Sequence, residues 1–368
     1  MRGLLRGKAR SVQLENFKGL FMRKRLNIGL IGMGRLGGVY ARYLLGSISD
    51  AALVAVCDSN EKALNIFADE YEIPKRFIEH GTLLADKEID AVVIVTPTST
   101  HKEIVVEATR HDKGIFCEKP LALSLDDCAE MKAAVEKKGA FCHFGLMRRF
   151  DSGYSAAKRK IEEGAIGKPI VIKCSSRDPY RPSLEFLDPK HSGGMFVDCG
   201  IHDIDLARWF MGEIKSVYSI GGTLAYPEMD EIGDVDNSIT TLEFKSGCLG
   251  VIDMSRSGVY GYDIQTEILG TEGTLRIGYL RETPLVVLKK NQVSHDTVPY
   301  FMERFGQAYR AQLQHFVDQF RAGKAPTITC DDGLAALRVC FAATQSWKEK
   351  RPIEVSPENT ISRGQGLC

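Results

Sequence analysis

"LNIGLIGMGRLGGVYARYLL", residues 26–45, decides the fold of the first half of the chain. Its first six residues form a short apolar run, which is typical of a buried strand. Glycines follow at positions 32, 34 and 37, and apolar side chains then recur at helical spacing, at 39, 40, 43 and 44. The order strand, tight turn, helix predicts the opening unit of a doubly wound parallel α/β sheet.

The three glycines form the pattern G-x-G-x-x-G, which is typical of dinucleotide-binding turns when it joins a strand to a helix. Gly32 permits the sharp turn, Gly34 lets a pyrophosphate approach the backbone, and Gly37 lets the helix pack against the strand. Free N–H groups at the helix N-terminus then favour the negative phosphates. We therefore assign a cofactor site to Gly32, Gly34, Arg35, Leu36 and Gly37.

Asp58 ends the second apolar run, "AALVAVC" at 51–57, and is the acid that such a site needs. Its carboxylate is expected to accept hydrogen bonds from the adenosine ribose and to repel a 2′-phosphate. Ser59 and Asn60 follow, with no arginine beside them to bind that phosphate, so the sequence predicts NAD rather than NADP. The alternative is that Asp58 only caps the next helix.

Two later apolar runs bring further polar residues to the same edge of the predicted sheet. "DAVVIVTPTSTH" (90–101) carries Thr96, Pro97 and His101, and "GIFCEKP" (114–120) carries Glu118 and Lys119. A doubly wound sheet binds its ligand at the carboxyl ends of its strands, so we expect these residues to lie beside the cofactor. The alternatives are a simple proline turn with His101 exposed on a helix, and a surface charge at Lys119.

The pattern changes after about residue 146, and a second domain is expected there. Helix-like stretches at 153–163, 301–322 and 331–349 flank strand-like text from 214 to 290, with hairpin turns at 244–250 and 270–275. This predicts an α+β domain with a mostly antiparallel open sheet. The expected division is a basic extension (1–25), a Rossmann domain (26–145), a substrate-binding and oligomerisation domain (146–355) and a tail (356–368).

The stretch "GGMFVDCGIHDIDLARWFMG", 193–212, combines acids and a histidine with an apolar helix pattern. In one helix over about 193–211, Asp198 and His202 would be one turn apart, and Asp205 would be near the same face. Burying such groups without a purpose is costly, so the pattern favours a chemical site. The alternative is a solvated helix face.

Taken together, G-x-G-x-x-G, "EKP" (118–120) and "GGMFVDCGIHDIDLAR" (193–208) resemble the glucose–fructose oxidoreductase/inositol dehydrogenase/rhizopine catabolism family over about residues 25–355. Four further stretches resemble its inositol 2-dehydrogenases: "GLMRRFD" (145–151), "SSRDP" (175–179), "GDVDNS" (233–238) and "SRSGVYGYD" (255–263). Leu146 stands where phenylalanine is more frequent, and "DCG" (198–200) varies among relatives. Both departures leave the preferred stereoisomer open.

The resemblance implies a catalytic group of Lys119, Asp198 and His202 for the NAD-dependent oxidation of myo- or scyllo-inositol to a keto-inositol. Such a reaction removes a hydroxyl proton and transfers a hydride from the same carbon. His202 suits the general base, because the usual pKa of an imidazole, about 6.5, lies near working pH. Asp198 would orient the ring or bind a neighbouring hydroxyl, and Lys119 would donate to the reacting oxygen.

An uncharged polyol needs several donors and acceptors around it. The resemblance implies that Arg148, Asp178, Asp205 and Tyr260 supply them, together with Asp198 and His202. Arg148 could equally form an interdomain salt bridge, and Tyr260 could pack on the sheet. Such a pocket has no need of a metal, and we expect none.

Composition narrows the remaining classes of function. Lys plus Arg and Asp plus Glu are both 48, so a balanced surface gives no reason to expect nucleic acid or a membrane as partner. Ten cysteines without ligand spacing suggest reduced thiols in a cytoplasmic protein. Residues 1–25, with eight basic residues and one acid, suggest a disordered extension or a transit peptide.

Other readings of the same residues remain open. A sugar or anhydrosugar dehydrogenase would use the same three catalytic residues, and an NAD-dependent glycosidase would use a transient oxidation. A non-catalytic NAD-binding regulator would be expected to lose Lys119 or His202, and the chain keeps both. Alternating apolar residues near 239–244 suggest a sheet face covered by another subunit, and the resemblance implies a homotetramer or dimer.

Overall fold

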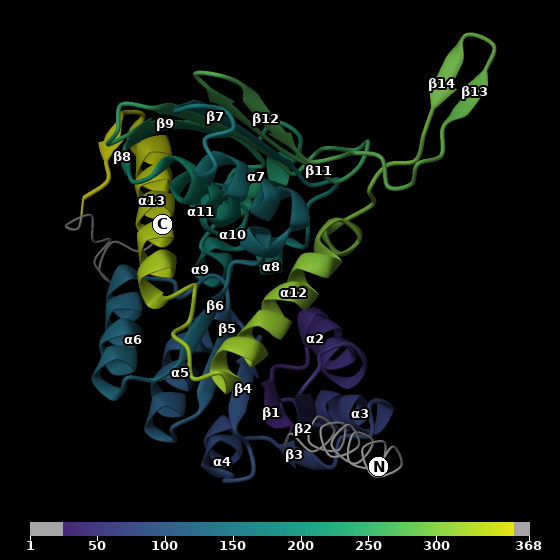
Figure 1. Ribbon diagram of the computed structural model, residues 1–368, viewed down its shortest axis with the longest axis vertical. Helices are drawn as coiled ribbons and strands as arrows, with labels where there is room; N and C mark the ends of the chain where they lie inside the picture. Colours follow the sequence, from purple (N-terminus) through teal and green to yellow (C-terminus); the bar gives the residue numbers. More distant parts are fainter. Residues whose placement is uncertain (1–24, 357–368) are drawn as a thin grey trace, which may run out of the picture.

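The computed structural model describes residues 25–356 and distributes them over two sheets, one above the other in Figure 1. The expectations for the basic segment before residue 25 and for the tail after residue 356 lie outside the described residues.

The first sheet has six strands, all parallel, in the order β3-β2-β1-β4-β5-β6. Its strands are β1 (Leu26–Ile31), β2 (Ala51–Cys57), β3 (Lys75–Phe77), β4 (Ala91–Ile94), β5 (Gly114–Glu118) and β6 (Cys142–Gly145). The strand order reverses beside β1, and the carboxyl ends of β1, β2, β4 and β5 therefore meet at one edge. The doubly wound fold predicted from the opening stretch is confirmed.

Helices connect these strands and bury their apolar faces on the sheet. They are α2 (Arg35–Gly46), α3 (Glu61–Glu70), α4 (His80–Ala85), the short η1 (Thr98–Thr100), α5 (His101–Arg110) and α6 (Leu125–Lys138). Ser124 caps α6 by accepting from the Asp127 N–H at 3.1 Å, and Gly139 ends it in the left-handed conformation. β3 and α4 are elements that the sequence pattern did not reveal.

The second sheet has seven strands in the order β12-β11-β7-β10-β9-β8-β15. They are β7 (Pro169–Arg177), β8 (Ile214–Gly222), β9 (Asn237–Phe244), β10 (Leu249–Ser255), β11 (Asp263–Gly270), β12 (Thr274–Ile277) and β15 (Ile353–Glu354). The two predicted hairpins, β9–β10 and β11–β12, are confirmed. One pair departs from the antiparallel pattern, because β7 comes from much earlier in the chain and runs parallel to β10.

Helices of the second half cover one face of this sheet, and its other face is turned away from them (Figure 1). The elements are η2 (Met147–Phe150), α7 (Ser152–Glu162), α8 (Leu184–Leu187), α9 (Pro189–Ser192), α10 (Met195–Asp198), α11 (Gly200–Met211), η3 (Pro227–Ile232), α12 (Phe301–Arg321) and α13 (Cys330–Glu349). In β9, Thr240, Leu242 and Phe244 are buried on the helix side, whereas Ile239 and Thr241 are exposed. The alternation expected from the sequence is therefore confirmed.

α12 connects the two halves, because it runs from the second sheet down to the first (Figure 1). Tyr43 of α2 donates to the Gly306 carbonyl at 2.8 Å, and Gln312 donates to Tyr40 at 2.7 Å. The first domain is thus completed by a helix that follows it by more than a hundred residues.

The single helix predicted over about 193–211 is interrupted. α10 ends at Asp198 and α11 begins at Gly200, with Cys199 between them in right-handed helical geometry (φ −89°, ψ −50°). Gly193 and Gly194, both at φ +81°, turn the chain into α10, and Asp234 accepts from the Met195 N–H at 2.9 Å. The motif "GDVDNS" therefore contributes an acid that holds the start of α10.

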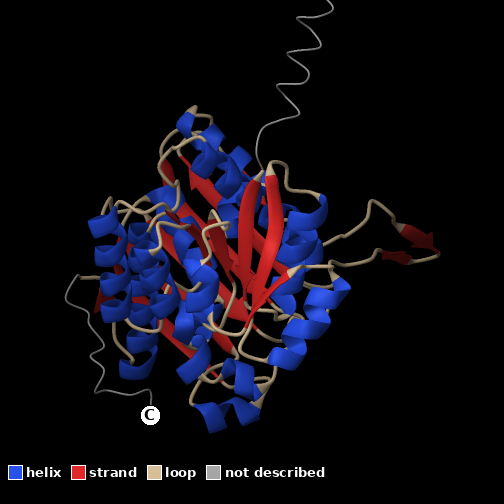
Figure 2. Cartoon of the chain, turned by 90° about the horizontal axis from the view of Figure 1, so that it is seen from below, coloured by secondary structure: helices blue, strands red, loops and turns tan. Residues whose placement is uncertain are grey.

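A two-stranded hairpin, β13 (Val287–Lys289) with β14 (Gln292–Ser294), extends away from the body in both views (Figures 1 and 2). Leu288 and Val293 on it are mostly exposed. Over residues 25–356, we find no helix with the length and apolar character that a membrane span requires.

Candidate active site

The glycine turn between β1 and α2 leaves space only where a cofactor would need it. A Cβ on Gly32, at φ +102°, would lie 2.8 Å from the Val95 backbone, and one on Gly37 would lie 2.2 Å from the Gly32 oxygen. Gly34, in contrast, has no heavy atom of residues 25–356 within 4 Å of its Cβ position, apart from its own neighbours in the chain. The backbone here is open for the close approach of a pyrophosphate, so the turn fits a dinucleotide.

Asp58 lies at the carboxyl end of β2 and braces this turn. One carboxylate oxygen accepts from the Met33 N–H at 2.8 Å, and the other accepts from the Asn60 N–H at 2.9 Å. The cap of α3 is Asn60 itself, whose side chain accepts from the Ala63 N–H at 3.1 Å. Asp58 therefore lies next to the dinucleotide turn and is more than a helix cap.

His101 joins the loops that follow β4 and β5. Its ring is buried, with Nδ1 2.9 Å from the Pro120 carbonyl and Nε2 3.0 Å from the Thr96 carbonyl. The alternative of an exposed helix residue is therefore wrong. His101 contacts the loops by both ring nitrogens, so its side chain positions Thr96 and Pro97 at the sheet edge.

Glu118 is the last residue of β5 and is completely surrounded by protein. Tyr40 donates to one carboxylate oxygen, Gln312 lies 3.3 Å from the same oxygen, and the Lys119 N–H donates to the other at 3.1 Å. Burial is the largest influence on this carboxyl group and raises its pKa. The network fixes the backbone from which Lys119 projects.

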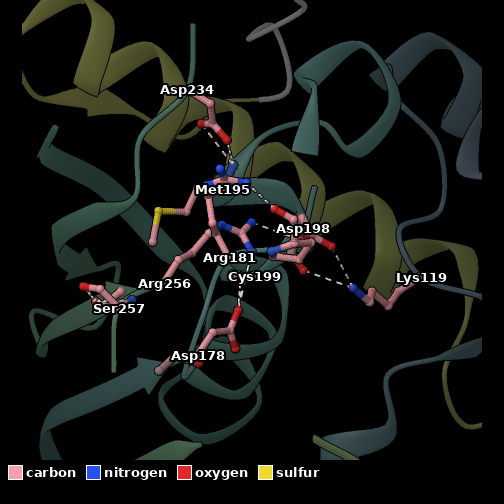
Figure 3. Close-up of polar contacts among 12 residues, drawn as sticks. Lys119, Asp178, Arg181, Met195, Asp198, Cys199, Asp234, Arg256 and Ser257 are labelled. Atoms are coloured by element: carbon pink, nitrogen blue, oxygen red, sulfur yellow. Dashed lines mark hydrogen bonds and ion pairs between the residues drawn. The ribbon is translucent and has the colours of Figure 1, made fainter. Parts of the chain in front are cut away.

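Lys119 extends from the end of β5 to the end of α10 (Figure 3). Its Nζ lies 3.0 Å from the Asp198 carbonyl and 3.5 Å from the Asp198 Oδ1. The side chains of Lys119 and Asp198 are 19% and 18% exposed, so a small molecule can reach both. The structure thus brings together two residues that lie 79 positions apart in the chain.

Asp198 keeps its charge in a buried place because two cations face it. Burial alone would raise the pKa of this carboxyl, but Lys119 and Arg256 outweigh burial and lower it below the usual value. Asp178 lies nearby and receives weak contacts from Arg256 at 3.4 Å and from the Cys199 thiol at 3.6 Å. Burial raises the pKa of Asp178, although Arg256 opposes this.

His202 lies on α11, the helix that follows Asp198. Burial lowers its pKa well below the usual value, and the positive charges of Lys119 and Arg148 add to the effect. Its Nδ1 is buried, and no donor or acceptor of residues 25–356 contacts it. The imidazole is therefore neutral at pH 7 and able to accept a proton.

Arg148 and Asp205 are held in buried ion pairs. Arg148 contacts Asp203 at 2.6 Å and Ser176 at 3.1 Å, and all three residues lie in the second domain, so this ion pair is not the interdomain salt bridge considered as its alternative. Both oxygens of Asp205 are taken by Arg149, at 2.5 and 2.9 Å. Because Asp205 is buried and both of its oxygens accept from Arg149, its assignment to the substrate stays a prediction.

Tyr260 lies in the loop after β10, and its hydroxyl donates to Asp263 at 3.0 Å. The side chain is exposed, and no contact ties it to Lys119, Asp198 or His202 in the described chain. Its assignment to the substrate therefore stays a prediction.

Two residues of the site were missed by sequence reasoning. Arg256 lies within "SRSGVYGYD", the motif from which only Tyr260 was assigned to the site. Its guanidinium contacts both Asp178 and Asp198. Tyr300, before α12, stacks on Tyr180, and the Arg35 guanidinium lies 5.7 Å from its ring centre. Burial raises the pKa of Tyr300 to about 12, with the Asp178 charge adding to it. Only the fold reveals such neighbours.

Two family models cover most of the chain. Residues 26–146 match the model of the GFO/IDH/MocA oxidoreductase family described as its NAD-binding Rossmann fold. Residues 158–355 match the model of its C-terminal alpha/beta domain. The two matches correspond to the two sheets of the structure.

Proteins of similar sequence align with this chain over nearly their whole length. The scyllo-inositol 2-dehydrogenase (NAD(+)) of Bacillus subtilis is 43% identical over 91% of this chain and 97% of its own. The myo-inositol 2-dehydrogenase of Thermotoga maritima is 38% identical over 90% and 98%. The Lactobacillus casei scyllo-inositol dehydrogenase structure with NAD(H) and scyllo-inositol superposes with a TM-score of 0.85 at 30% identity, over 90% of this chain and 99% of that one. This chain, with its glycine turn and its Lys119–Asp198 contact, belongs to the GFO/IDH/MocA family of NAD-binding oxidoreductases.

Proposed function

We propose that this protein is an NAD-dependent inositol 2-dehydrogenase that oxidises myo- or scyllo-inositol to a keto-inositol. The observation that carries the proposal is the contact of Lys119 with Asp198 beside a neutral, buried His202. An ammonium donor, an ionised carboxylate and a free imidazole are the groups that alcohol oxidation needs. The curated relatives named for inositol oxidation support the choice of substrate.

The proposed mechanism divides the work among His202, Lys119 and Asp198. His202 removes the hydroxyl proton, because burial and nearby cations keep its imidazole neutral. Lys119 donates a hydrogen bond to the same oxygen as negative charge develops on it. Asp198 keeps Lys119 in place and offers acceptors to a neighbouring hydroxyl. NAD, held at the turn of Gly32, Gly34 and Gly37, supplies the nicotinamide C4 that takes up the hydride.

A panel assay tests this proposal. The protein is mixed with NAD and a set of inositols and sugars, and reduced cofactor is followed by absorbance. Steady accumulation with myo- or scyllo-inositol supports it, whereas accumulation only with a sugar or anhydrosugar shows the rival dehydrogenase. Cleavage of a nitrophenyl glycoside without accumulation indicates the glycosidase. Binding of NAD without either reaction indicates the regulator.

Cofactor choice depends on the charge of Asp58. Asp58→Asn keeps only one of the two oxygens that accept from the Met33 and Asn60 N–H groups, and it removes the charge that repels a 2′-phosphate. We therefore expect the ratio of kcat/KM for NAD over NADP to fall at least about tenfold, which corresponds to about 1.4 kcal/mol. Both cofactors are titrated at saturating polyol. Glu61→Gln, an exposed acid in the first turn of α3, is the control and should change neither value. An unchanged ratio in Asp58→Asn would show that the acid does not select the cofactor.

A homo-oligomer, a tetramer or a dimer, is part of the proposal. The outer face of the second sheet carries a set of exposed large apolar side chains, which are Tyr218, Ile220, Ile239, Leu249 and Leu269. Exposed apolar area of this kind marks an interaction surface. Ile220 lies directly beside Ile239 across the β8–β9 pair, which makes a centre for such a contact.

We expect Ile239→Asp to shift the protein toward monomer, because a charge at the centre of an apolar interface would lose its hydration. Light scattering on a sizing column measures the mass. Val259→Asp, on an exposed loop, is the control. A mass unchanged from the parent in Ile239→Asp would place the subunit contact elsewhere.

A cytoplasmic location completes the proposal. All nine cysteines of residues 25–356 are free, and eight of them are buried. Free thiols in this number are typical of proteins in a reducing compartment.

A further inference from the structure

The parallel strands β7 and β10 place a carboxylate and a guanidinium next to each other at one end of the second sheet. β7 and β10 are in register up to their last residues, Arg177 opposite Ser255. The Asp178 N–H donates to the Ser255 carbonyl at 2.8 Å. Asp178 and Arg256 therefore lie side by side at the carboxyl ends of these strands, close to Asp198, although 78 positions separate them in the chain.

The Arg256 side chain is buried between two carboxylates (Figure 3). Its Nη2 lies 3.1 Å from the Asp198 Oδ2, and its Nη1 lies 3.4 Å from the Asp178 Oδ2. The other oxygen of Asp198 faces Lys119. Arg256 is only 1% exposed, so its guanidinium does not contact a substrate directly and would act on one through the two carboxylates.

Two carboxylates, Asp178 and Asp198, face two cations, Lys119 and Arg256, in this group. A third buried carboxylate, Asp234, accepts from the Met195 N–H, and Arg148 is already paired with Asp203. The other titratable groups that face these charges are Cys199, His202, Tyr262 and Tyr300. Without Arg256, two buried carboxylates would share one cation, and such pairs take up a proton.

Resting on the proposed dehydrogenase activity, we propose that Arg256 is a positioning residue of the reaction. Its guanidinium fixes the two carboxylates and opposes the effect of burial on their charge, so that both can accept hydrogen bonds from substrate hydroxyls while Lys119 donates to the reacting oxygen. Arginine suits this task because it presents separate N–H groups to two acceptors in a rigid plane. Lysine keeps the charge without that geometry.

Replacement of Arg256 with methionine, which is unbranched, shorter and uncharged, tests this role. We expect the acid limb of the kcat/KM profile to move upward by roughly one to three pH units, because an acid that loses its cationic partner titrates that much higher. At a pH below the new limb, each unit costs about tenfold in kcat/KM, and raising the pH restores the rate. Arg256→Lys should move the limb less than Arg256→Met does.

A second readout is independent of turnover. The infrared difference spectrum of Arg256→Met minus the parent protein, both as NAD complexes at pH 7, should show an additional protonated carboxyl band. Arg304→Met is the matched control, because Arg304 is also buried and pairs with Asp151 at 2.7 Å, away from Lys119. It should lower the melting temperature without moving the acid limb.

The outcomes separate the two proposals. Failure of the parent protein to oxidise any polyol would refute the dehydrogenase, whereas the infrared comparison would still decide the charge role of Arg256. A loss of kcat/KM that is equal at all pH values, with no new carboxyl band, would overturn the inference and reduce Arg256 to a structural residue. If Arg256→Met does not fold, Arg256→Gln, which also removes the charge, takes its place, and an unmoved limb in a folded, slow Arg256→Gln contradicts the proposal.

Discussion

Replacing Lys119 with methionine lowers kcat for inositol oxidation by roughly 10²–10³-fold, the loss expected when one preorganised donor to a developing oxyanion is removed. The Nζ of Lys119 is held 3.0 Å from the Asp198 carbonyl, so it needs no reorganisation before it donates. Methionine keeps the unbranched shape of the side chain, is one atom shorter and removes the charge. NAD affinity should change little, because the glycine turn and Asp58 lie on other strands.

Turnover is followed by cofactor absorbance at saturating inositol, and NAD affinity is measured by calorimetry on the same preparations. Lys138→Met, an exposed lysine at the end of α6, serves as the control and should match the parent in both. A parallel loss of turnover and NAD affinity in Lys119→Met would assign Lys119 to the cofactor instead of the reacting oxygen. Lys119→Arg should remain slow, because a planar guanidinium does not reproduce the position of Nζ.

Replacing His202 with asparagine lowers kcat/KM by roughly 10²–10⁴-fold, the usual contribution of a general base. The sign of the pH dependence follows from the direction of the pKa shift. Burial and the charges of Lys119 and Arg148 lower the pKa of His202, so the active, neutral form is present at pH 7. In the parent protein, activity due to this group therefore declines only as the pH falls below the usual imidazole value of about 6.5.

The pH profile separates a base from a packing residue. In His202→Asn the acid limb that belongs to the imidazole should disappear, and the residual rate should rise with pH as hydroxide replaces the missing base. His295→Asn, on the loop after β14, is the control and should keep the parent profile. A profile of unchanged shape in His202→Asn, only scaled down, would contradict the assignment of His202 as the base.

The success of sequence reasoning differed between the two halves for a physical reason. The β1 turn and α2 depend on local properties, which are the apolar run, the glycines and the helical spacing of residues 39 to 44, and the structure has them as expected. The parallel pair β7–β10 depends on contacts between segments far apart in the chain, so no local sequence pattern predicted it. Arg256 was missed with it.

The ion pair of Asp205 is a second feature that local sequence patterns could not predict. Helical spacing correctly put it near the turn of His202, but Arg149, 56 positions earlier, holds both of its carboxylate oxygens. The choice among possible partners is made by packing of η2 against α11, which lies outside the information in a helical pattern.

The sequence by itself determined the dinucleotide turn and the alternation of parallel strands with helices in the first domain, because short-range sterics and periodicity govern them. Only the tertiary structure decided which of the buried charges meet: Lys119 with Asp198, Arg256 between two acids, and Asp205 with Arg149. A buried charge needs its partner within a few ångströms whatever the distance along the chain, and that partner is set by how the sheets and helices pack.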